Sequence, residues 1–349
     1  MHEVAIIGAG SWGTALAVLL ASNGHRVRLW GRSAELMAQM AAARHNARYL
    51  PEARLPELVT PTGDEAEALS GAGFVILAVP SVGLRDIARR VAAHVPQQAL
   101  LVSAAKGLEP QTGKRLSEVI LEELPAGAQE RLVALSGPNL AQEVARGIPT
   151  AAVAASRTQS ASAAVQDLFS SHTFRVYTSP DVAGVELGGA LKNIIAIGAG
   201  ISDGLGFGDN TKAAMAARGL VEMARLVIAL GGLPETLSGL AGVGDLMATC
   251  VSRQSRNWGV GYRLGRGERT QDILASMHMI AEGIPTAQAA KGLSDKLGVE
   301  MPITQELYQV IFQDKQPLDA VRDLMTRDRK QELEHLASLR EIGWFRDTS

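Results

Sequence analysis

The chain of 349 residues contains a single cysteine, Cys250, and only 4% of its residues are aromatic. One cysteine cannot form an intramolecular disulfide, so a disulfide scaffold and a cysteine-rich metal site are excluded and a reducing compartment is indicated. An excess of either charge is also lacking, because 34 Lys+Arg stand against 36 Asp+Glu, a net charge of -2. There is therefore no electrostatic reason to expect a nucleic-acid partner.

Targeting, membrane and metal signals are missing as well. The first ten residues, MHEVAIIGAG, lack the basic and apolar segments of a signal peptide. No uncharged apolar run approaches the roughly 18 residues of a membrane span. The seven histidines are dispersed, and no histidine, cysteine and carboxylate cluster has ligand spacing. We expect a cytoplasmic protein with no metal and no stable membrane insertion.

Glycine, in contrast, is abundant, with 36 residues. Many of them gather in residues 184–208 and 231–267, and three stand at Gly8, Gly10 and Gly13. Clusters of glycine mark places where the backbone must approach something closely.

The periodicity of apolar residues divides the chain into two parts. Short apolar runs, separated by helical patterns such as 35–48 and 82–94, predict strands at 4–7, 26–30, 74–79, 99–103, 132–135 and 151–154. This alternation predicts a Rossmann-type, doubly wound α/β domain over residues 1–180. Residues 181–349 show helical patterns and no convincing strand, which predicts an all-α domain with helices at 182–201, 211–230, 270–278, 284–297, 303–312 and 317–340.

The first motif, GAGSWG, places Gly8, Gly10 and Gly13 in the pattern G-x-G-x-x-G. It follows a predicted strand and opens a predicted helix, which is the context of a dinucleotide-binding loop. Gly8 permits the tight turn, Gly10 lets the pyrophosphate approach the backbone, and Gly13 lets helix and strand pack closely. An ordinary glycine-rich turn is the alternative.

The second predicted strand bears on which dinucleotide binds. An NAD site usually has an acidic residue about twenty residues after the loop, for the ribose hydroxyls. Here the strand is followed by Gly31 and Arg32, and a guanidinium can pair with a 2′-phosphate. The sequence favours NADP(H), with NAD(H) as a second accepted cofactor. The alternative is that Arg32 is an ordinary surface charge.

The second motif is a lysine inside an apolar helix. Lys192 is the only charged residue of 187–201, and Gly188 and Gly189 on its face are expected to leave room for a ligand. Burial lowers the pKa of a lysine toward neutrality, which suits a general acid and base. A lysine that reaches out to solvent from the helix surface is the alternative.

Two later segments carry further candidate residues. Asp245 stands between glycine and the start of an apolar helix, where it caps the helix or pairs with a catalytic lysine. Ser255, Arg256 and Asn257 combine a forked donor with an amide, which suits a phosphate, whereas a surface turn is the alternative reading.

Taken in order, the motifs make the chain resemble the bacterial NAD(P)-dependent glycerol-3-phosphate dehydrogenases over nearly its whole length. The matching segments are IIGAGSWGTALA (6–17), YLP (49–51), AVPS (78–81), AAKGLE (104–109), SGPNLAQEVARGIPTA (136–151), ELGGALKNIIAIGAGISDGLGFGDNTKAA (186–214), LAGVGDLMATC (240–250) and SRNWGVG (255–261). The resemblance implies a helical domain like the C-terminal part of 6-phosphogluconate dehydrogenase.

The resemblance also implies roles for individual residues. Lys192, Lys106 and Asp245 are expected to be catalytic. The residues expected at the cofactor are Gly8, Gly10, Ser11, Trp12, Gly13, Arg32, Lys106, Ala141, Arg256, Ile280 and Glu282. The residues expected at the substrate are Lys106, Gly137, Asn139, Lys192, Asn193, Asp245, Ser255, Arg256 and Asn257. Many relatives have a serine where this chain has Asn139, which puts the contact of that residue in doubt.

The activity that the resemblance implies is the reversible reduction of dihydroxyacetone phosphate to sn-glycerol 3-phosphate with NAD(P)H, supplying phospholipid synthesis. A homodimer is compatible with the long apolar helices of the second half. A β-hydroxyacid dehydrogenase or 2-dehydropantoate reductase, in which Arg256 and Asn257 hold a carboxylate, is the alternative enzyme. A non-enzymatic NADPH-binding protein is the alternative from another class.

Overall fold

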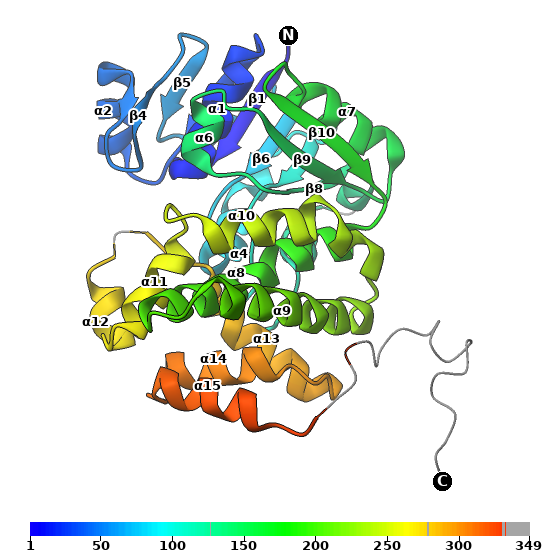
Figure 1. Ribbon diagram of the computed structural model, residues 1–349. Helices are drawn as coiled ribbons and strands as arrows, with labels where there is room; N and C mark the ends of the chain where they lie inside the picture. The colour runs from blue at the N-terminus through cyan, green and yellow to red at the C-terminus, as the bar shows by residue number, and fades with distance from the viewer. Residues whose placement is uncertain (126, 278, 330–331, 333–349) are drawn as a thin grey trace.

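The computed structural model describes residues 1–125, 127–277, 279–329 and 332, and it has a sheet at one end and layered helices at the other (Figure 1). The eight sheet strands have the order β10-β9-β8-β7-β6-β1-β2-β5. Neighbouring strands are parallel except β8 and β9. Their bounds are β1 (Glu3–Ile7), β2 (Arg26–Trp30), β5 (Val59–Thr62), β6 (Phe74–Leu77), β7 (Leu100–Ser103), β8 (Leu132–Ser136), β9 (Thr150–Ala155) and β10 (Phe174–Ser179). The six predicted strands are confirmed, and β5 and β10 were missed.

Helices cover both faces of this sheet, as in a doubly wound fold. One face packs against α1 (Ser11–Ser22), α2 (Ala34–Ala43), α6 (Ala141–Ala145) and α7 (Gln159–Phe169). The other face packs against α3 (Glu65–Leu69), α4 (Leu84–Val91) and α5 (Leu116–Glu123). Along β1, Val4 and Ile6 join the first apolar cluster, while Ala5 and Ile7 join the second. A strand that is buried on both faces needs such a continuous apolar run.

A small antiparallel hairpin leaves the sheet half after α2. The predicted helix over 35–48 is too long, because α2 ends at Ala43 and Arg44 adopts a left-handed conformation with a φ of 52°. The chain then forms β3 (His45–Asn46) and β4 (Leu50–Arg54), which pair with each other.

The second half contains no strand within the part of the chain that the structure describes. Its helices surround the central helix α8, as Figure 1 shows. Their bounds are α8 (Val182–Gly204), α9 (Asp209–Ala229), α10 (Asp245–Val251), α11 (Arg256–Gly265), α12 (Thr270–Ala275), α13 (Gly283–Leu297), α14 (Pro302–Phe312) and α15 (Pro317–Thr326). The predicted helix over 317–340 ends at Thr326, and most of its remainder, 330–331 and 333–340, lies outside the described residues.

Helix α8 is a core helix. By length and composition it is apolar enough to cross a membrane, but 89% of its most apolar window is buried inside the molecule. It contacts the sheet half as well, because Val185 packs with Ala134, Val153 and Ala155 of β8 and β9. The central helix therefore lies between the sheet and the outer helices.

Helices α8 and α11 cross at very short distance. A Cβ added to Gly261 would lie 1.9 Å from the carbonyl oxygen of Ile197, and one added to Gly200 would lie 2.0 Å from that of Trp258. Gly204 and Gly265 face each other one turn further along. Only glycine permits such contact between two helix backbones, and it places the first residues of α11 close to the middle of α8.

Candidate active site

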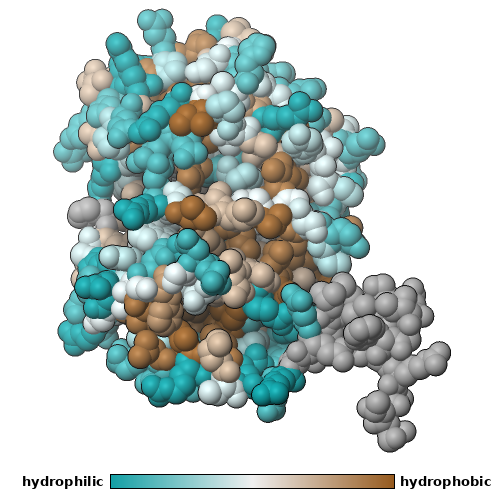
Figure 2. Space-filling view, in the orientation of Figure 1, coloured by the Kyte–Doolittle hydropathy of each residue, from teal (hydrophilic) through white to brown (hydrophobic). Residues whose placement is uncertain are grey.

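The predicted site residues meet at a cleft of about 960 Å³ at the carboxyl ends of β1, β2, β6 and β7. This edge is where open α/β sheets bind ligands. On the viewed face, Figure 2 shows mostly hydrophilic residues over the sheet half and more apolar residues over the helical half. The predicted residues that line the cleft are Gly8, Gly10, Ser11, Trp12, Arg32, Lys106, Asn139, Ala141, Lys192, Asn193, Ser255, Arg256, Asn257, Ile280 and Glu282. Gly13, Gly137 and Asp245 lie behind this lining.

The loop between β1 and α1 has the geometry of a phosphate cradle. Gly8 has a φ of 120°, and a Cβ on Gly13 would lie 1.8 Å from the Gly8 carbonyl oxygen. Gly10 faces open space, and no side chain caps the N-terminus of α1 that follows it. Trp12 fixes the loop by donating its indole N–H to the Ala104 oxygen at 2.9 Å. The uncapped helix end and the space beside Gly10 fit a pyrophosphate.

The ribose end of the cleft is formed after β2. Trp30, Gly31, Arg32 and Ser33 line it, and none of them is acidic. Ser33 is occupied in capping α2, since its hydroxyl accepts a hydrogen bond from the Leu36 N–H at 3.2 Å. Arg32 is exposed to the cleft, as the preference for NADP(H) requires.

A buried carboxylate joins the two candidate lysines. Asp245 accepts from the Lys106 Nζ at 2.8 Å through Oδ2 and lies 2.9 Å from the Lys192 Nζ through Oδ1. Its side chain is 2% exposed, against 15% for Lys106 and 7% for Lys192. Of the two readings of Asp245, pairing with a lysine is therefore the correct one. Two ammonium groups around one carboxylate leave a net positive charge for an anionic ligand.

The environment shifts the pKa values of this group. Burial, partly opposed by Asp245, lowers the pKa of Lys192 to about 8. Burial alone would raise the pKa of Asp245, but the two ammonium groups outweigh it and the pKa stays below its ordinary value. Lys192 can therefore both hold and release a proton close to neutral pH, and the reading of Lys192 as a solvent-reaching surface lysine is wrong.

Thr249 belongs to the same group and was missed from the sequence. Lys192 donates to the Thr249 hydroxyl at 2.5 Å, and that hydroxyl donates to the Asp245 carbonyl oxygen at 2.7 Å. The available signal was its position four residues after Asp245, which places both on one face of α10. Thr249 gives the Lys192 ammonium a second fixed partner.

The expected role of Gly188 and Gly189 is wrong. A Cβ on Gly188 would lie 2.5 Å from the Ala241 carbonyl oxygen, and one on Gly189 would lie 2.4 Å from the Ser136 Oγ. Both glycines let α8 pack against its neighbours. They do not open space for a ligand beside Lys192.

Two amides tie the elements of the site together. The Asn257 Nδ2 donates to the Asn193 Oδ1 at 2.8 Å, and the Asn257 Oδ1 accepts from the Gly283 N–H at 2.9 Å. Asn193 also reaches the Lys106 carbonyl oxygen at 3.4 Å. These bonds hold α8, α11, α13 and the loop after β7 in one arrangement.

The segment from Ser255 to Asn257 begins helix α11, so its reading as a surface turn is wrong. Ser255 caps the helix by accepting from the Trp258 N–H at 3.2 Å. Arg256 donates to the Ile280 carbonyl oxygen at 2.7 Å while its side chain remains exposed to the cleft. The cleft thus meets a helix N-terminus with a guanidinium at its first residue, a combination that favours anions.

The segment after β8 offers an acceptor to the cleft. Gly137 accepts from the Lys106 Nζ at 2.6 Å through its carbonyl oxygen. The Asn139 Nδ2 donates to the Ala151 oxygen at 2.9 Å, but its Oδ1 is buried without a hydrogen-bond partner among the described residues. Buried polar atoms are normally paired, so this oxygen fits a donor on a ligand.

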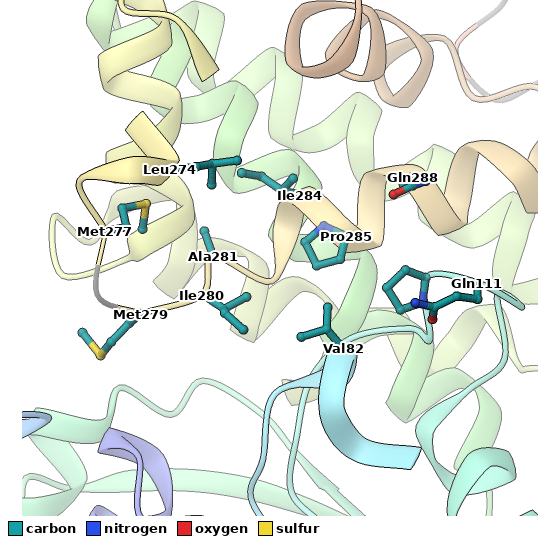
Figure 3. Close-up of a pocket in the computed structure, with 11 residues that line it drawn as sticks. Val82, Gln111, Leu274, Met277, Met279, Ile280, Ala281, Ile284, Pro285 and Gln288 are labelled. Carbon is teal, nitrogen blue, oxygen red and sulfur yellow. The ribbon is translucent and has the colours of Figure 1, made fainter. Parts of the chain in front are cut away.

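Ile280 and Glu282 lie where α13 meets the sheet half. Glu282 accepts from the Ser81 N–H at 3.0 Å and is also bonded to the Ser81 hydroxyl, which joins the two halves. Beside them is a smaller apolar pocket of about 450 Å³, and Val82, Met279 and Ile280 line both spaces. Figure 3 shows these side chains with Leu274 and Ile284 above them. Within the described residues, no group of three or more metal-ligating side chains is found.

Comparisons with known proteins agree with this geometry. Residues 3–162 match the family model described as NAD-dependent glycerol-3-phosphate dehydrogenase N-terminus, and residues 181–322 match the corresponding C-terminus model. The chain belongs to this family. It is 49% identical to a glycerol-3-phosphate dehydrogenase [NAD(P)+] of Geobacillus thermodenitrificans, over 97% of this chain and 99% of that protein.

Solved structures of the glycerol-3-phosphate dehydrogenase family share the architecture. The crystal structure of the Coxiella burnetii glycerol-3-phosphate dehydrogenase has a TM-score of 0.89 and 39% identity, covering 93% of this chain and 99% of that one. A ketopantoate reductase of Ralstonia eutropha has a TM-score of 0.59 and 20% identity, covering 91% and 99%. The second likeness shows the fold alone.

Proposed function

We propose that the protein reduces dihydroxyacetone phosphate to sn-glycerol 3-phosphate reversibly, with NADPH as the preferred cofactor and NADH also accepted. The observation that carries this proposal is the buried group of Lys106, Asp245 and Lys192, which opens into a cleft with a dinucleotide cradle. Its net positive charge suits a phosphorylated ketone. The family of the chain and the names of its relatives support the same activity.

The cofactor would be held by the sheet half. The cradle of Gly8, Gly10 and Gly13 and the N-terminus of α1 would take its pyrophosphate, with Ser11 and Trp12 beside it. Ala141, Ile280 and Glu282 line the same cleft and would complete the contact. When bound, the reduced nicotinamide supplies the hydride for the carbonyl carbon.

Lys192 would supply the proton. Negative charge builds on the substrate oxygen during reduction, and the Lys192 and Lys106 ammonium groups are the cations available to stabilise it. Lys192 then gives its proton to that oxygen, and in the reverse reaction its neutral amine takes the proton back. Asp245 and Thr249 orient the amine through bonds of 2.9 and 2.5 Å.

The first turn of α11 would hold the phosphate of the substrate. Arg256 supplies a forked donor, with Ser255 and Asn257 on either side of it. Binding the phosphate away from the reacting carbon fixes the orientation of a three-carbon substrate, which is a large part of catalysis. Asn139, whose Oδ1 lacks a partner among the described residues, together with Gly137 and Asn193, would contact the remaining hydroxyl groups.

The cellular part of the proposal follows from this activity. The product, sn-glycerol 3-phosphate, would supply phospholipid synthesis from the cytoplasm. We further propose that residues 1–180 act as the cofactor domain and 181–349 as the substrate domain. The boundary falls between β10, which ends at Ser179, and α8, which begins at Val182. The apolar helices are compatible with a homodimer.

An assay of the purified protein with NADPH tests the substrate directly. Oxidation of NADPH should be rapid with dihydroxyacetone phosphate and close to background with ketopantoate. Running both substrates with NADH gives the cofactor preference in the same experiment. Turnover of ketopantoate alone would identify a 2-dehydropantoate reductase, and binding of NADPH without turnover of any small ketone would indicate a non-enzymatic binding protein.

A further inference from the structure

Besides Arg32, a second arginine of the sheet half lines the cleft from a different element. The turn between β3 and β4 carries Arg48 and Tyr49, and both line the cleft together with Arg32. In Figure 1, β4 lies beside α2 and β5 at the edge of the sheet half. Two guanidinium groups from separate segments, one after β2 and one in the β3–β4 turn, therefore line the cleft in which a dinucleotide would lie.

The contacts of these two arginines differ from those of Arg85 and Arg90 on α4. Arg90 pairs with Glu65 at 2.6 Å, and Arg85 reaches three glutamates. Within the described residues, neither Arg32 nor Arg48 forms an ion pair or a hydrogen bond through its guanidinium. Arg48 lies only over the ring of Tyr49, 5.2 Å from its centroid. Their donors are available to a ligand.

The turn that carries Arg48 is fixed to the phosphate cradle. Asn46 is fully buried and donates to the Ala9 carbonyl oxygen at 3.1 Å and to the Thr14 hydroxyl at 2.7 Å. Its Oδ1 accepts from the Tyr49 N–H at 3.2 Å. One buried amide therefore sets the position of the turn relative to the loop that would hold the pyrophosphate. The backbone at Arg48 is therefore held in position before a ligand binds, which reduces the entropy lost on binding.

We propose that Arg48 acts with Arg32 as a second guanidinium for the 2′-phosphate of NADPH, so that the β3–β4 hairpin determines cofactor specificity. The inference rests on the proposed function, in which the cleft binds a dinucleotide. A phosphate monoester carries a charge of about -1.5 to -2 at pH 7, which two guanidinium groups neutralise through forked hydrogen bonds. NADH has a hydroxyl group there, so Arg48 contributes little to its binding.

The test compares Arg48→Gln with Arg54→Gln. Arg54 is exposed on the same hairpin but does not line the cleft, so it is a matched control. Isothermal titration calorimetry gives the dissociation constants of NADPH and NADH, and of the fragments 2′,5′-ADP and 5′-AMP. Arg48→Gln should weaken NADPH and 2′,5′-ADP roughly tenfold, as the loss of one charge-assisted contact does, and change NADH and 5′-AMP less than about twofold. Arg54→Gln should leave all four unchanged.

Equal weakening of NADPH and NADH by Arg48→Gln, or no change in either, would overturn the inference. A wild-type protein that binds neither dinucleotide would overturn it as well. The titrations need no ketone substrate. Tight NADPH binding with the expected loss in Arg48→Gln, but without turnover of dihydroxyacetone phosphate, would contradict the proposed reaction and leave the role of Arg48 supported.

Discussion

Gly10 of the β1–α1 loop and the glycines of the α8–α11 crossing serve opposite purposes. A Cβ on Gly10 would meet no protein atom within 4 Å, because the space beside it is the cleft. A Cβ on Gly261 or Gly200 would collide with the backbone of the opposite helix. Gly10 leaves room for a ligand, and the glycines of the crossing bring two helices into contact.

This difference corresponds to the different roles proposed for the sheet half and the helical half. The loop would contact the cofactor through its backbone, whereas the crossing positions the side chains that would bind the substrate. Close contact of α8 with α11 lets the Asn257 Nδ2 donate to the Asn193 Oδ1 at 2.8 Å and brings Arg256 to the same cleft as Lys192. Substitutions at the two places should therefore fail in different ways.

The largest effect is expected from Lys192→Ala, which removes the proton donor and leaves the cofactor loop intact. The turnover number should fall about a thousandfold, within the range of general acid catalysis, while the NADPH dissociation constant stays within about twofold. Steady-state kinetics and calorimetry measure the two quantities. Lys296→Ala, at an exposed lysine of α13, is the control and should behave as wild type. Near-normal turnover would remove Lys192 from the mechanism.

The next effect tests the crossing. Gly261→Ala should lower the free energy of unfolding by about 2–3 kcal/mol, because the added methyl overpacks two backbones. Gly259→Ala, on the same helix with open space around its Cβ position, should leave stability unchanged or raise it by about 0.5–1 kcal/mol. Chemical denaturation of the two variants measures both free energies of unfolding. Equal stabilities of the two variants would show that the backbones do not touch.

Gly10→Ala tests the loop. The methyl group should weaken NADPH binding roughly tenfold or more, because it occupies the space of the pyrophosphate. The free energy of unfolding should change by less than about 1 kcal/mol, as for other substitutions of glycine at a helix N-cap. Calorimetry measures the NADPH affinity, and chemical denaturation measures the free energy of unfolding. A destabilised variant with unchanged NADPH affinity would place Gly10 with the structural glycines.

The smallest effect concerns pH. Reduction needs the protonated amine of Lys192, whose pKa is about 8, so the turnover number for reduction should fall as the pH rises through that value. Oxidation of sn-glycerol 3-phosphate needs the neutral amine, so its turnover number should rise over the same range. The test is a pH profile in each direction at saturating substrate. Two profiles that change in the same direction would exclude a shared acid and base.

The sequence was sufficient where the signal is local. Strand β1, the glycine loop and β2 follow from short apolar runs and one motif, and the structure has them at almost the same residues. Strand β5 was missed because Pro61 interrupts its pattern, which an edge strand tolerates. Helix α11 was missed because its glycines, including Gly261 and Gly265, suggest a loop. Their helical role depends on α8, which lies far away in the sequence.

The site residues also show that contacts between segments far apart in the sequence cannot be predicted from local patterns. Lys192 stands out as the one charge in an apolar helix, and Asp245 stands out beside glycine. Their bond, and the second bond of Asp245 to Lys106, depend on how the two halves pack. Thr249 and Arg48 look ordinary in the sequence, because their place in the cleft follows from the start of α10 and from the turn of a hairpin.

A crystal structure of the protein with NADP⁺ and sn-glycerol 3-phosphate would test the proposed roles of Lys192, Arg256 and Arg48 together. We expect the C2 oxygen within hydrogen-bonding distance of the Lys192 Nζ, the substrate phosphate at Arg256, and the 2′-phosphate of the cofactor at Arg32 and Arg48. A substrate bound with its C2 oxygen away from Lys192 would contradict the role of Lys192 as proton donor, and a phosphate away from α11 would contradict the phosphate site.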